Sequence, residues 1–269
     1  MALPGLLFLV LCFVWPVVSM LARAFTDPTL GLGNFEDFVS SPIDSHSLLV
    51  TIQTSVIITV ICLAIGYPYA YALVHASRRV AATLLTIVLV SLWLNIVARS
   101  FAWEVILRDT GVINRLLESL GWINQPLPMM YTATGVIIGM TNILLPWMVL
   151  PLYVVMSRID PELPRASAGL GAGPIRSFAT IFFPLSLPGV LAGALLVFVQ
   201  ALGFYITPAL LGGGTFLTLS QMIVDQVQHL EWGAASAAGI VLLSFVALSL
   251  GLASRFIRVG DFFGASAEN

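Results

Sequence analysis

Between Ser157 and Gly189 the chain reads SRIDPELPRASAGLGAGPIRSFATIFFPLSLPG. Asp160 is a good N-cap residue and Pro161 suits a first helical turn, so a short helix is predicted to begin here. Gly171 stands where a glycine would end that helix, and Pro174 can open a second one. The stretch therefore predicts a compact helix–Gly–helix hairpin.

The first helix of this hairpin carries one small, weakly apolar face. Leu163, Ala166, Ser167 and Leu170 recur at i, i+3, i+4 and i+7. Small side chains let another protein approach closely, which favours docking. The alternative is an amphipathic helix on the lipid headgroups, although the large apolar face and basic rim of such helices are missing. The residues alone leave both interpretations open.

Long apolar runs flank the hairpin on both sides. Of the 269 residues 59% are hydrophobic and 9% charged, with a mean hydropathy of +1.01, whereas soluble domains carry about 25% charged residues. A helix needs roughly 20 apolar residues to cross a bilayer. The runs of that length, none with strand-like alternation, are Leu3–Ala22, Leu48–Val74, Ala81–Trp103, Thr132–Val155, Phe183–Leu210 and Ala234–Ala253. The sequence predicts an all-α membrane protein with six transmembrane helices.

Loop charges predict how these helices are oriented. With both termini in the cytoplasm, seven of the eleven arginines fall on the cytoplasmic side, as the positive-inside rule requires. The hairpin segment, about 156–183, then lies in the cytoplasm between the fourth and fifth helices of a single transmembrane domain, 1–269. The first run could instead be a cleaved signal peptide, but its length and the lack of a preceding positive charge favour a retained helix.

Composition also argues against several other classes of function. The net charge of -2 gives no reason to expect a nucleic-acid partner. Cys12 and Cys62 lie within apolar runs, which is typical of small buried residues. The three histidines lie far apart in the sequence, so no metal site is predicted.

The hairpin segment resembles the EAA loop of binding-protein-dependent ABC importer permeases. That pattern is Glu-Ala-Ala, three residues, Gly, nine residues and Ile-x-Leu-Pro. Arg165-Ala166-Ser167 occupy its first positions, Gly171 its glycine and Ile181-Phe182-Phe183-Pro184 its end. The departures are Arg165 for Glu, Ser167 for Ala and Phe183 for Leu.

The resemblance continues along the chain and is closest to the spermidine/putrescine-type permeases. The matching motifs are Asn34-Phe35, Gly66-Tyr67-Pro68, Arg99-Ser100-Phe101-Ala102-Trp103, Leu145-Pro146, Pro151-Leu152-Tyr153, Pro184-Leu185-Ser186-Leu187-Pro188-Gly189 and Thr207-Pro208-Ala209-Leu210-Leu211-Gly212-Gly213. Their shared order, more than any single match, carries the resemblance.

The resemblance implies a permease of the bacterial inner membrane that forms half of the pathway for a small, polyamine-like solute. It implies three partners: a cytoplasmic ATPase dimer, a second permease and an extracytoplasmic binding protein. The ATPase would contact Arg165, Ala166, Ser167, Leu170 and Gly171, with Arg165 needing an acidic or carbonyl partner. ATP hydrolysis is expected in the separate subunit and no cofactor in this chain, because it has no G-x-x-x-x-G-K-[ST] loop and no lysine.

Five polar residues inside the predicted spans are candidates for the pathway. They are Asn95, Arg99, Asn142, Gln200 and Thr207. Each needs a partner in lipid, so hydrogen bonding within the bundle and substrate contact are both open. Arg99 could extend to the membrane interface, or form a gate near Glu104 and Asp109.

Two other classes of membrane protein are less consistent with the sequence. A secondary transporter commonly shows inverted repeats and ionisable groups at the membrane midplane. A membrane enzyme would need His, Asp, Glu or Cys side chains clustered near one face. Because neither pattern is found, the sequence favours the ABC permease.

Overall fold

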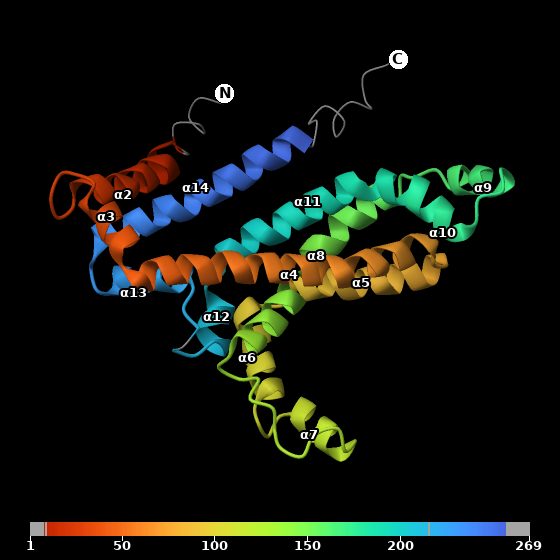
Figure 1. Cartoon of the computed structure of the whole chain (residues 1–269), viewed down its shortest axis with the longest axis horizontal. Helices are drawn as coiled ribbons and strands as arrows, with labels where there is room; N and C mark the ends of the chain where they lie inside the picture. Colours follow the sequence, from red (N-terminus) through yellow and green to blue (C-terminus); the bar gives the residue numbers. More distant parts are fainter. Residues whose placement is uncertain (1–7, 9, 215, 257–269) are drawn as a thin grey trace.

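The computed structural model describes residues 8, 10–214 and 216–256, apart from the side chains of Pro164, Arg165, Ala168 and Phe256. Every regular element within these ranges is helical, which confirms the predicted all-α class. The arrangement is a bundle of long helices with a hairpin at one end and shorter helices near the other (Figure 1).

Four helical runs in the described part are long and apolar enough to cross a membrane, or five if one bent pair counts as a span. They are α4 (Pro42–His75), α8 (Ala133–Met156), the continuous run Pro174–Leu202 and α14 (Trp232–Phe256). The run Pro174–Leu202 comprises α10 (Pro174–Ser177), the π-helical turn η2 (Phe178–Phe182) and α11 (Phe183–Leu202).

The first predicted span is only partly described. A shorter apolar helix covers Val10–Thr26, formed by the π-helical turn η1 (Val10–Val14) and α2 (Trp15–Thr26). Most of the residues at the start of the predicted run Leu3–Ala22 lie outside the described residues.

The third predicted span, Ala81–Trp103, is wrong as a single straight helix. α5 (Arg78–Trp93) ends inside it, and the helical stretch that begins at Ile96 is bent away by 103°. Asn95 explains where the new helix starts, because its side-chain oxygen accepts hydrogen bonds from the backbone N–H groups of Val97, at 2.8 Å, and Ala98, at 3.3 Å. α6 (Ile96–Leu107) follows.

The fifth predicted span, Phe183–Leu210, is also too long. α11 stops at Leu202, Gly203 follows, and a separate short helix, α12 (Ile206–Leu211), comes next. Pro208 lies in the first turn of α12, where its missing N–H has no helical partner to lose. The capped helix α13 (Leu219–Gln228) then leads to α14.

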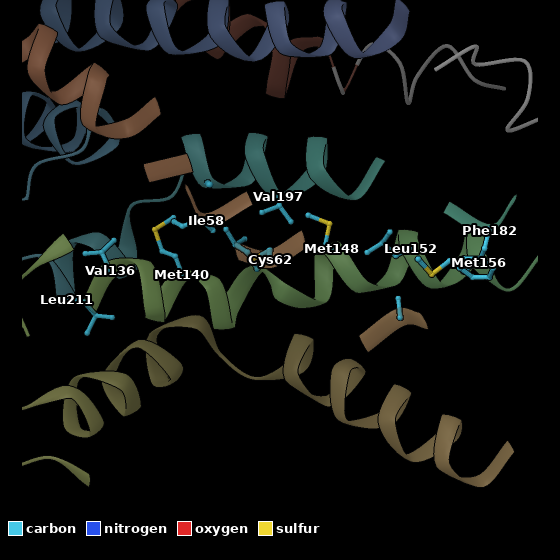
Figure 2. Close-up of a cluster of buried hydrophobic side chains, with 13 residues drawn as sticks. Ile58, Cys62, Val136, Met140, Met148, Leu152, Met156, Phe182, Val197 and Leu211 are labelled. Atoms are coloured by element: carbon cyan, nitrogen blue, oxygen red, sulfur yellow. The ribbon is translucent and has the colours of Figure 1, made fainter. Parts of the chain in front are cut away.

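α8 is the central helix of the bundle. Its buried side chains recur about every fourth residue and pack against α4 and α11 (Figure 2). They include Met140, Met148, Leu152 and Met156. Close packing needs glycine here, since a Cβ on Gly193 of α11 would lie 2.8 Å from Met148 Sδ and 3.1 Å from the Met148 carbonyl oxygen.

The remaining helices complete the two ends of the bundle. α2 packs on the start of α14, where Ser236 Oγ donates to the Met20 carbonyl at 2.7 Å and Arg23 lies 5.2 Å from the Trp232 ring centroid. α3 (Gly33–Ser40) lies beside both, whereas α7 (Val112–Ser119) projects away from the bundle (Figure 1).

Candidate functional site

The hairpin after α8 forms from local signals in its own sequence. α9 (Glu162–Gly169) begins where an Asp160 carboxylate oxygen accepts a 2.9 Å hydrogen bond from the Glu162 N–H. The helix is followed by Gly171, which has φ +86°, while the Ala172 N–H donates to the Ser167 carbonyl at 3.1 Å. This is the left-handed turn that glycine adopts readily. The chain thus forms the helix–Gly–helix hairpin that its sequence predicts, with α10 as the second helix.

The hairpin extends past the ends of the helices that carry it (Figure 1). Leu170 is 91% exposed and Ile175 is 83% exposed, so two large apolar side chains lie open at its turn. Ala166 and Gly171 are also exposed, and Ser167 is half-buried. The Arg165 side chain, the fifth predicted coupling position, lies outside the described residues.

A groove separates the hairpin from the helices beneath it. Its volume is about 400 Å³. It is lined by Val155, Arg158, Ile159, Asp160, Leu163, Leu185 and Pro188. Of the residues of α9, Leu163 lines this groove.

Arg99 lies at the break between α5 and α6 and is only 8% exposed. Its guanidinium donates to the carbonyls of Ser91, at 2.9 Å, and Asn142, at 2.7 Å, and to Asn142 Oδ1 at 3.1 Å. Arg99 therefore does not extend to an exposed interfacial position. Nor does it pair with Glu104, which forms an ion pair with Arg108.

The next residue, Ser100, fixes the other side of α6. Its hydroxyl lies 2.9 Å from Thr207 Oγ1 on α12, and both side chains are fully buried. Arg99 and Ser100 thus attach the start of α6 to α8 and α12 together. Ser100 is not one of the residues that the sequence singles out as a site, although a serine beside an arginine in an apolar run is a signal that can identify it.

Three of the five predicted pathway residues, Arg99, Asn142 and Thr207, are therefore linked to the first turns of α6 by side-chain contacts, and a fourth, Asn95, lies at its start. Arg99 contacts Asn142 directly, and Thr207 contacts the neighbouring Ser100. Asn95 is exposed and caps α6, while Gln200 is exposed on α11.

A second groove, of about 500 Å³, opens beside this cluster. It is lined by Thr86, Ile87, Val90, Ser91, Leu94, Arg99, Ala102, Trp103, Ile106 and Asn142. Its wall is mostly apolar, with a positive charge bound to neutral oxygens. The hydrogen bonds of Arg99 join α5, α6 and α8 beside this groove. None of the lining side chains is an anion that would attract a cationic solute.

The described residues also contain no group of three or more His, Cys, Asp or Glu side chains able to hold a metal ion. Cys62 is buried and Cys12 is exposed, and both are free thiols. The main features of the described part are therefore an exposed hairpin, the bent helix pair α5 and α6, and the polar contacts that join the start of α6 to neighbouring helices.

Comparison with known proteins agrees with this architecture. No family model matches the chain. The chain is 35% identical over 210 residues to the spermidine/putrescine transport system permease protein PotB of Escherichia coli K12, covering 78% of this chain and 76% of that protein. The corresponding protein of Haemophilus influenzae is 33% identical over 209 residues, covering 77% of this chain and 73% of that protein.

A solved structure shares the fold at much lower identity. It is a bacterial ABC transporter involved in the import of the acidic polysaccharide alginate, with a TM-score of 0.74, 19% identity and coverage of 95% of this chain and 94% of that chain. At this identity the match supports the fold and carries no information on the solute.

Proposed function

Because the chain belongs to the family of ABC transporter permeases that includes the spermidine/putrescine permeases, we propose that it forms half of a translocation pathway for a polyamine-like solute. The polyamine assignment follows the sequence relatives. A transporter of an acidic polysaccharide has the same fold, so the fold is compatible with solutes of opposite charge. An extracytoplasmic binding protein is expected to deliver the solute.

The hairpin is the proposed contact with the motor of this importer. The observation that carries this proposal is the exposure of Leu170, 91%, and Ile175, 83%, at the turn that follows the capped helix α9. Exposed apolar side chains on a projecting hairpin favour a protein partner, because burying them there removes apolar surface from water. The proposed partner is a cytoplasmic ATPase subunit that binds and hydrolyses ATP.

The proposed topology has six spans with both termini in the cytoplasm. The first span would be completed by the helix Val10–Thr26, and the bent pair α5 and α6 would form the third. Arg78 and Arg79 start α5 at the same end of the bundle as the hairpin (Figure 1), which agrees with the positive-inside rule. α7 then lies on the opposite, outer side.

A second permease is proposed to pair with this chain. Only 28% of the most apolar window of α4 and 22% of that of α14 is buried, compared with 61% for α8. The outer helices thus retain broad apolar faces for lipid and for a partner permease.

Cysteine cross-linking in the assembled transporter tests the hairpin contact. Leu170→Cys should form a disulfide with a cysteine placed in the ATPase, in a background where Cys12 and Cys62 are replaced. Leu120→Cys is the matched control, because Leu120 is also exposed, at 54%, but lies beside α7. A hairpin cysteine that cross-links no better than this control would refute the docking role.

A further inference from the structure

Six aromatic rings join the last turns of α4 to the segment that follows the hairpin. They come from Tyr67, Tyr71 and His75 on α4, Phe178 and Phe182 on η2, and Phe183 at the start of α11. We name this set the aromatic clamp. The three α4 rings are spaced four residues apart, so they form one stripe along the helix.

Tyr71 is at the centre of the clamp. Its ring centroid lies 5.7 Å from that of Phe178 and 5.1 Å from that of Phe182, at interplanar angles of 81° and 82°. It also lies 4.1 Å from the His75 ring. Edge-to-face contacts of this kind are directional, because a positive ring edge meets a negative ring face. They fix the orientation of η2 on α4, which an aliphatic contact of similar size would not.

A hydrogen bond extends the clamp to α11. The hydroxyl of Tyr67 lies 2.9 Å from Ser186 Oγ, one turn beyond the Phe183 ring, whose centroid lies 6.0 Å from that of Tyr67. Phe182, between the two ends, is 5% exposed. The clamp therefore runs from the hairpin side into the bundle, with Phe182 as its buried member.

The clamp includes two rings of the π-helical turn and packs that turn against α4. In η2 the Phe183 N–H bonds to the Phe178 carbonyl, and Pro184 follows without an N–H to donate. π-helical turns and prolines are sites where helices bend. A displacement of the hairpin could be absorbed by bending here unless other contacts stiffen the turn, and the clamp provides those contacts.

We propose that the aromatic clamp makes η2 and the last turns of α4 move as one body, so that displacement of the hairpin moves α4. Tyr71, Phe178 and Phe182 act as positioning residues for transport, since they connect the motor contact to a long helix of the bundle. This inference rests on the proposed function, because it requires the hairpin to be the ATPase contact.

Substitution of Tyr71 tests the clamp in the complete transporter reconstituted in proteoliposomes. Tyr71→Leu should reduce solute uptake per ATP hydrolysed by roughly 3- to 30-fold, with basal ATPase activity and subunit assembly retained. Tyr71→Phe keeps the ring and should restore the wild-type ratio. Tyr69→Leu is the matched control, because it also removes a tyrosine ring from α4. Tyr69 is not part of the clamp, and its hydroxyl donates a hydrogen bond to the Leu84 carbonyl of α5. A wild-type ratio in Tyr71→Leu would overturn the clamp.

A distance measurement tests the rigid-body claim without altering the clamp rings. Spin labels at Ala72→Cys on α4 and Ala179→Cys on η2 occupy exposed positions. Their separation should stay the same in the nucleotide-free and ATP-trapped transporter. A changed separation while Leu170→Cys still cross-links to the ATPase overturns the clamp and leaves the proposed function intact. Absence of that cross-link overturns both.

Discussion

Arg99 places a positive charge among the helices of a membrane protein, where it is bound by neutral oxygens. Three hydrogen bonds, to Ser91 and Asn142, replace the water that the guanidinium would have at the surface. A planar fork can reach acceptors on two sides, which a lysine ammonium on a flexible stem does less well. Arg99 therefore links α5, α6 and α8 through its hydrogen bonds.

Removal of the Arg99 guanidinium is predicted to destabilise the folded protein. Arg99→Leu removes three hydrogen bonds made by a guanidinium on a residue that is only 8% exposed, which should lower the free energy of unfolding by about 1–3 kcal/mol. Thermal unfolding in detergent measures the effect. Arg108→Leu is the control, because the Arg108 side chain that pairs with Glu104 is 56% exposed, and ion pairs at exposed sites contribute little. Equal losses of stability in both variants would contradict the proposed role of Arg99 in linking the three helices.

Gly171 adopts a left-handed backbone conformation that glycine tolerates better than other residues. Its φ of +86° is strained for residues with a Cβ, and a Cβ there would meet nothing within 4 Å. Gly171→Val should therefore distort the hairpin turn without disturbing the membrane bundle, at a local cost of about 1–2 kcal/mol.

Transport coupling is where the Gly171 change is expected to appear. Uptake and stimulated ATPase activity should fall in Gly171→Val while assembly with the other subunits remains close to wild type. Gly171→Asn should retain more activity, because asparagine tolerates the left-handed region better than β-branched residues do. Normal uptake in Gly171→Val would contradict the coupling role.

At the scale of elements, the packing of α8 against its neighbours depends on glycines. Gly66 of α4 and Gly193 of α11 approach Met148 from two sides, with Cβ positions 2.9 Å from its Cγ and 2.8 Å from its Sδ. Three helices can therefore converge at one residue. Larger side chains would push them apart.

Gly193→Leu is predicted to disrupt this convergence. The added side chain meets the backbone carbonyl of Met148, which cannot rotate away, so a loss of about 1–3 kcal/mol in unfolding free energy is expected. Gly239→Leu on α14 is the matched control, since a Cβ there meets nothing within 4 Å. Thermal unfolding of both variants in detergent compares them, and an equal shift would show that close helix approach is not the cause.

At the scale of the whole molecule, the hairpin and α7 are predicted to lie on opposite sides of the membrane. A membrane-impermeant maleimide should label Leu120→Cys in intact spheroplasts and Leu170→Cys only after permeabilisation, in a background without Cys12. Both leucines are exposed, so accessibility alone does not separate them. Labelling of Leu170→Cys from outside would invert the topology and remove the ATPase contact.

The sequence by itself determined the features that depend on short-range signals. An all-helical chain followed from the long apolar runs, and the hairpin followed from Asp160 and Gly171, whose turns are closed by hydrogen bonds between residues only a few positions apart. The membrane helices α4, α8 and α14 were also predicted, since length and apolar composition suffice for them.

Only the tertiary structure decided the 103° angle between α5 and the helical stretch after it, the separation of α12 and the partners of Arg99 and Thr207. Arg99 meets Asn142 across 43 residues, and Ser100 meets Thr207 across 107. The reason is physical: a polar group in an apolar run must find a partner, but its identity depends on which distant helix packs beside it. The aromatic clamp belongs to this class too, because its rings meet only after α4 and η2 have packed.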